Sequence, residues 1–205
     1  VLTSTWILRL SSEETRQALQ ECLVQPPGDG EARPLDEEQG RKLISFCERQ
    51  KAVLAAPAIL TFNGQRGNIV SGEQRAYTKG YTLCMTDDSE IWDPEIAYLQ
   101  TGILYDIQGS FQGPDTLRMS VDFKVSELLR MRQIDTPYGM MEVPEVREGR
   151  IQSQWTQGRE GRVLLLGDSE EPGKKILLLV KSVALSTEET KTPSAPLNPP
   201  GRRGP

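Results

Sequence analysis

The residues best suited to chemistry in this sequence are the acids Asp87, Asp88, Glu90 and Asp93, which lie close together in one polar stretch. Paired carboxylates hydrolyse glycosidic bonds, and clustered carboxylates bind calcium. However, the stretch 86–90 lacks the glycine and the distal glutamate of an EF-hand loop. Hydration explains such acids most simply, so we predict no metal site. A catalytic β-domain that uses these carboxylates is the least favoured hypothesis, and it requires a concave acidic pocket.

Other reactive groups are scarce. The chain has no histidine, which removes the commonest general base and the cysteine–histidine and serine–histidine mechanisms. Its three cysteines, Cys22, Cys47 and Cys84, are odd in number and widely spaced, which argues against a zinc site or a disulfide framework. The sequence therefore predicts that the protein is not an enzyme and that it has no catalytic residues, metal ligands or cofactor.

Composition excludes further kinds of partner. The 205-residue chain has a formal net charge of −5 and only 6% aromatic residues, so we expect no nucleic acid partner. No apolar run approaches the roughly 20 residues of a membrane-spanning helix. Membrane association through a β-barrel stays open, because barrel strands need only about 10 residues each.

The N-terminal part of the chain predicts one strand and two helices. Residues 3–10 alternate in polarity, as a half-buried strand does. Residues 12–24 and 37–52 each carry an apolar stripe with helical spacing. Each of these helices begins with the spacing of a capping box, in which side chains satisfy free backbone amides: Ser11 with Glu14, and Asp36 with Gln39.

From Ala58 onward the pattern changes to β-strands. The clearest strand is 117–125, in which apolar and polar residues alternate. Residues 176–180 are apolar on both faces, which is typical of a central strand. Residues 128–139 are predicted to be irregular. The tail, 186–205, is dominated by Ser, Thr, Pro, Glu and Gly, so we expect it to be disordered.

The stretch 56–77 is the most informative about family. The β-prone segments 59–62 and 68–70 flank Asn63 and Gly64, which predicts a type I′ hairpin because both residues tolerate positive φ. The order of Ala-Pro, Leu, Asn-Gly-Gln, Ile, Gly, Gln and Tyr in this stretch resembles the start of the C-terminal domain of bacterial secretins. Secretins are the multimeric outer-membrane channels of type II and type III secretion and of type IV pilus machines.

The resemblance continues, in order, over residues 35–185. The segments that stand where the family has its later strands are Gly102–Ile107, Leu117–Val125, Glu142–Ser153, Arg162–Gly167 and Lys174–Leu185. It implies an α+β fold in which a β-α segment and a capped helix precede an antiparallel, β-rich secretin-type domain. It also implies a homo-oligomeric ring or channel in the bacterial cell envelope, in the outer membrane or periplasm, with other secretion-system or envelope proteins as further partners.

The residues expected to matter most in such a domain are structural. We expect Pro57 to start the first strand, Asn63 and Gly64 to form the hairpin, and Gly72 to bend the chain before Tyr77. We expect Gly102 to permit a close approach of two backbones, Pro144 to return the chain to the sheet, and Gly167 to end a strand.

Departures from the family favour an alternative. Asp168 stands where a second glycine is usual, and residues 168–173 join two strands directly where the family has a longer, membrane-proximal segment. The alternative is a non-channel, soluble envelope scaffold or interaction domain derived from the same fold. We divide the chain into a strand-helix segment (1–30), a secretin-like β-rich domain (35–185) and the tail (186–205).

Overall fold

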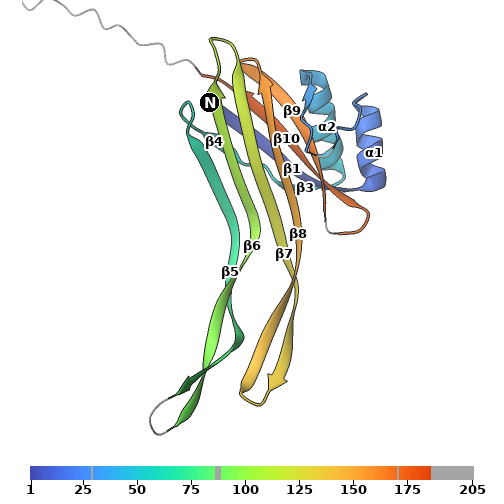
Figure 1. Ribbon diagram of the computed structural model, residues 1–205. Helices are drawn as coiled ribbons and strands as arrows, with labels where there is room; N and C mark the ends of the chain where they lie inside the picture. The colour runs from blue at the N-terminus through green and yellow to red at the C-terminus, as the bar shows by residue number, and fades with distance from the viewer. Residues whose placement is uncertain (29, 86–88, 170, 186–205) are drawn as a thin grey trace, which may run out of the picture.

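The first of two sheets lies in the middle of the molecule. The structure is a computed structural model that describes residues 1–28, 30–85, 89–169 and 171–185. The strands of the first sheet, in spatial order, are β2 (Arg33–Leu35), β9 (Glu160–Asp168), β10 (Lys174–Val183), β1 (Leu2–Ser11) and β3 (Val53–Ala55), and β4 (Ala58–Leu60) also pairs with β1. Two helices, α1 (Ser12–Glu21) and α2 (Glu37–Arg49), lie on one face of this sheet (Figure 1).

The second sheet packs on the other face of the first. Its four strands follow the order of the sequence: β5 (Arg66–Met85), β6 (Glu90–Phe111), β7 (Leu117–Thr136) and β8 (Gly139–Gln157). These strands are much longer than the first sheet is wide, so their distal halves extend beyond it as two ribbons (Figure 1). The fold is α+β and rich in antiparallel sheet, as predicted.

Strand β10 separates two hydrophobic cores. Ile176, Leu178 and Val180 face the second sheet, whereas Leu177 and Leu179 face the helices. All five side chains are at most 1% exposed. Because successive side chains of a strand point to opposite faces, a strand that is apolar throughout suits this central layer. The prediction of a central strand over residues 176–180 is confirmed.

The core between the two sheets is built from the proximal halves of the long strands. The alternating residues of β7 that were predicted to face inward are all buried: Leu117, Met119, Val121, Phe123 and Val125. Tyr105 of β6 is also buried and shares a 2.6 Å hydrogen bond between its hydroxyl and that of Thr5 in β1. This bond ties the two sheets together, and burial raises the pKa of the Tyr105 phenol.

Both helices have the predicted capping boxes but end earlier than predicted. Each ends in a Schellman motif, with the non-glycine residues Leu23 and Lys51 at a φ of +54°. The amide of Val24 donates to the carbonyl of Leu19 at 2.9 Å in the first of these motifs. The left-handed residue turns the chain away from the helix axis, so α1 stops at Glu21 rather than near residue 24.

The predicted Asn63-Gly64 hairpin is wrong. The segment before the turn, β4, pairs with β1, whereas β5 pairs with β6, so the turn links two different sheets. A type I′ turn needs positive φ at both residues, and only Gly64 has it, at +74°. The turn is instead held against β6, where the amide of Gly64 donates to the carbonyl of Gly109 at 2.8 Å. Long-range pairing therefore overrides the local hairpin signal.

Two further expectations are corrected. Residues 128–139 are not irregular, because β7 continues as a strand to Thr136. Residues 1–30 do not form a segment beside the β-rich part, since β1 pairs with β10, β3 and β4 inside the first sheet. Gly167 lies one residue before the end of β9 and still pairs with Ile176 of β10, and a Cβ at this position would lie 2.4 Å from a side-chain carbon of Ile151. The predicted disordered tail lies outside the described residues.

Candidate assembly surface

Two facing glycines mark the point where the second sheet divides. Gly72 of β5 pairs with Gly102 of β6, and pairing between β6 and β7 ends at the same place, with Gly102 opposite Ser126. Gly102 has a φ of +112°, which side chains rarely permit. A Cβ on Gly72 would lie 1.8 Å from the carbonyl oxygen of Thr101, so neither position can accept one without movement. The two glycines therefore allow β5 and β6 to bend away from β7 and β8.

Beyond this point the sheet continues as two separate hairpins (Figure 1). The first arm consists of residues 73–85 of β5 and 90–101 of β6. The second arm consists of residues 127–148, which include the distal part of β7, the turn at residues 137–138 and the first part of β8. Two-stranded ribbons twist strongly, and in both arms the two strands cross over one another. This crossing turns β5 of the first arm towards β8 of the second.

The arms have no core of their own. No described residue in either arm is buried. Nine of the 17 large hydrophobic residues that are exposed in the described part of the chain lie in the arms: Leu83, Met85, Ile91, Ile96, Tyr98, Leu129, Ile134, Tyr138 and Met140. Isolated two-stranded hairpins are marginally stable in water. The arms thus expose the apolar surface that a partner would cover.

Most of the exposed large apolar residues of the first arm gather on one face. A bulge at Lys79 shifts the register, after which Tyr81 pairs with Pro94 and Leu83 pairs with Trp92. The alternation of β6 places Ile96 and Tyr98 on the same face as Pro94 and Trp92. The opposite face is mixed, with Thr82 paired with Asp93 and Gly80 with Glu95, but also Ile91 paired with Cys84. The first arm therefore has one face that is richer in exposed apolar side chains than the other.

Both edges of the second sheet are open among the described residues. Within that part of the chain, strand β5 pairs only with β6, and β8 pairs only with β7 apart from one isolated bridge between Gly149 and Ser169. Because the four strands alternate in direction, β8 of one copy and β5 of another can pair in the antiparallel sense of the rest of the sheet. Unpaired edges of this kind bind further strands.

An ion-pair network fixes the base of the second arm to the first sheet. Arg147 lies 3.8 Å from Glu127 and 3.3 Å from Glu171, and Arg9 of β1 lies 3.3 Å from Glu127. Lys174, 2.7 Å away, holds the pKa of Glu171 below its ordinary value. These contacts join the base of the arm to the first sheet at the point where the arm leaves the core.

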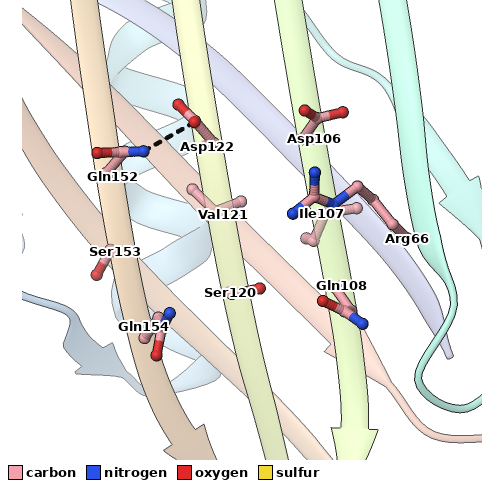
Figure 2. Close-up of a pocket in the computed structure, with 10 residues that line it drawn as sticks. All are labelled: Arg66, Asp106, Ile107, Gln108, Ser120, Val121, Asp122, Gln152, Ser153 and Gln154. Atoms are coloured by element: carbon pink, nitrogen blue, oxygen red, sulfur yellow. Dashed lines mark hydrogen bonds between the residues drawn. The ribbon is translucent and has the colours of Figure 1, made fainter.

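The outward face of the second sheet is polar near the core and contains a shallow hollow of about 370 Å³ (Figure 2). Asp122 lies in this hollow, where Arg150 bonds it at 2.7 and 3.1 Å and the amide of Gln152 bonds it at 2.8 Å. The Arg150 guanidinium holds the pKa of Asp122 below its ordinary value. Asp106 accepts from Asn68 at 2.5 Å. Both carboxylates therefore act as hydrogen-bond acceptors on this face of the sheet.

The other sequence-predicted residues are scattered over the molecule. Pro57 lies between β3 and β4. Pro144 lies inside β8, which is an edge strand of the second sheet, where a proline is tolerated. Tyr77 is half-buried in the first arm. Glu90 and Asp93 lie in β6 near the tip of this arm, whereas Asp87 and Asp88 lie outside the described residues. The structure therefore does not gather the four acids into a pocket of described residues.

Sequence reasoning missed a contact between the two arms. The rings of Trp92 and Tyr138 are stacked with their centroids 3.7 Å apart. The hydroxyl of Tyr81 donates to the carbonyl of Met140 at 3.2 Å, and a Cβ on Gly139 would lie 2.1 Å from the same hydroxyl. The sequence offered no signal for this contact, because Trp92 and Tyr138 stand singly and far apart along the chain.

Comparisons with known proteins found no match among protein-family models, curated proteins or solved structures. In the described part of the chain, no helix is both long and apolar enough to cross a membrane. No group of three or more cysteine, aspartate or glutamate side chains in that part is placed to hold a metal ion.

Proposed function

We propose that this chain is a secretin-like subunit that assembles with copies of itself into a ring in a bacterial envelope secretion or pilus-type system. The observation that carries the proposal is the second sheet, which is open at both ends and continues into arms without a core. Copies added edge to edge would pair the free strands and cover the apolar faces of the arms. The order of motifs over residues 35–185 supports the secretin-like assignment.

The site of assembly in this proposal is the pair of edges formed by β5 and β8. Addition of β5 from one copy to β8 of the next is a heterologous contact, because different surfaces meet. Repeated heterologous contacts form a closed ring when the rotation from copy to copy completes a full turn. The polar face around Asp122 and Asp106 would then form one continuous wall that faces water. The outer membrane or the periplasm is the location that the secretin resemblance implies.

An alternative is a soluble envelope scaffold that uses the same fold without a channel. The observation in its favour is the short connection between β9 and β10, which spans only residues 169–173. At the corresponding position, the secretins that this chain resembles have a longer, membrane-proximal segment. A scaffold of this kind would use the arms to bind one or two partners.

The mass of the native protein separates the two proposals. We expect size-exclusion chromatography with light scattering, on protein extracted in detergent from its native membrane or envelope fraction, to give a large oligomer of uniform mass. A monomer or small oligomer over the whole accessible concentration range would contradict ring assembly and favour the scaffold.

A further inference from the structure

The contact between the arms uses backbone groups at the two open edges of the sheet. The amide of Thr78 in β5 donates to a carboxylate oxygen of Glu142 at 3.4 Å, and the carbonyl of Met140 in β8 accepts from the hydroxyl of Tyr81 at 3.2 Å. Strands β5 and β8 form no ladder with one another. Each bond therefore joins a side chain of one arm to the backbone of the other. These are groups that an added strand would need for its own hydrogen bonds.

The aromatic stack beside these bonds holds the arms together. Trp92 and Tyr138 meet at an interplanar angle of 22°, and they come from the tips of different arms. The ion pair of Arg75 with Glu142, at 3.9 Å, lies on the side of the contact nearer the core. We call these six residues the clasp: Arg75, Thr78, Tyr81 and Trp92 of the first arm, with Tyr138 and Glu142 of the second.

The clasp is weak enough to be reversible. Tyr138 is 49% exposed although its ring is stacked. Both hydrogen bonds to the backbone are longer than the usual 2.8–3.0 Å or so, and the ion pair is near the upper limit of such contacts. A partner that supplies a full ladder of backbone bonds would therefore replace the clasp with stronger contacts.

We propose that the clasp is an autoinhibitory contact, which holds the arms of a single copy against one another until a second copy displaces it. This inference rests on the proposed function, because it assigns a regulatory role to the same edges. It explains how a chain with open edges avoids indiscriminate pairing before assembly. Natural sheet proteins protect free edges in comparable ways.

Releasing the clasp should promote assembly. In the variant Glu142→Ala, which removes the ion pair with Arg75 and the acceptor of the Thr78 amide, we expect the midpoint concentration for oligomer formation to fall roughly twofold to tenfold, the range that corresponds to one hydrogen bond. The measurement is light scattering over a dilution series. The matched control is Glu145→Ala, which removes a carboxylate that is paired with Arg130 of the same arm.

Locking the clasp should prevent assembly. Thr78→Cys and Glu142→Cys, in a Cys84→Ser background, place one thiol on each arm, and a short bismaleimide joins them in dilute protein. Cys22 and Cys47 are buried, and burial raises the pKa of Cys47 to about 12, so they react slowly. The control is the same variant capped with N-ethylmaleimide.

The two experiments distinguish the clasp from the proposed function. A locked form that stays monomeric while the capped form assembles supports autoinhibition. A locked form that assembles as readily as the capped form, or a release variant that assembles no better than the wild type, overturns autoinhibition and leaves ring assembly intact. If the wild-type, capped and released forms all remain monomeric at every concentration, both proposals are overturned.

Discussion

Replacing Gly102 with alanine should lower the free energy of unfolding by about 3 kcal/mol. The new Cβ would lie 2.3 Å from the carbonyl oxygen of Ser71 and 2.5 Å from the Cα of Gly72, and both of these atoms belong to backbone. The φ of +112° adds strain, because residues with a side chain rarely adopt it. Urea denaturation followed by circular dichroism would measure the loss.

The control for this variant is Gly113→Ala. Gly113 lies in the turn between β6 and β7, and a Cβ there would have no neighbour within 4 Å. We expect a change within about 0.5 kcal/mol, as for most surface substitutions. Equal stability of the two variants would contradict the close approach of β5 and β6 and remove the explanation of why the arms separate from the core.

Placing lysines on the apolar face of the first arm should weaken assembly at least a hundredfold. Ile96 and Tyr98 are 50% and 68% exposed in the single chain, so Ile96→Lys/Tyr98→Lys should leave its stability nearly unchanged. In an assembly that covers this face, two charges would be buried without partners, which costs several kcal/mol. A dilution series followed by light scattering would compare the variant with the wild type.

The control replaces an equally apolar residue outside the arms. Phe62 is 83% exposed and lies just after β4, so Phe62→Lys should assemble like the wild type. If both variants assemble normally, the arms contribute nothing to contacts between copies. If both fail, the loss comes from added positive charge rather than from the face of the arm.

The sequence was informative where burial is one-sided or complete. Residues 117–125 alternate because one face of β7 contacts the first sheet, and residues 176–180 are apolar throughout because β10 lies between two cores. The helix starts at Ser11 and Asp36 could also be predicted, because all the hydrogen bonds of a capping box form within four residues of the chain. In each case the pattern has one of two causes: burial of the faces of a single strand, or contacts between residues that are close in the sequence.

The arms could not be predicted from the sequence, because they have no buried face that would impose a pattern. Residues 128–136 form a strand, yet neither face of the second arm is buried, so no alternation between apolar and polar residues was selected there. The Asn63-Gly64 turn misled because its flanking segments pair with β1 and β6, which lie far away in the sequence. Stacking between Trp92 and Tyr138 depends on the twist of two separate hairpins, so the spacing of these residues along the chain does not predict it.

The central claim is that β8 of one copy pairs with β5 of another, and cross-linking between two single-cysteine variants tests it most directly. One population carries Val70→Cys on β5, the other carries Gln154→Cys on β8, and both have a Cys84→Ser background; each position is exposed in the single chain. After co-assembly and treatment with a short bismaleimide, we predict covalent dimers that contain one chain of each kind, and none when either variant is treated alone. Dimers formed by the Gln154→Cys variant alone, or no cross-linked dimers in the mixture, would contradict the claim.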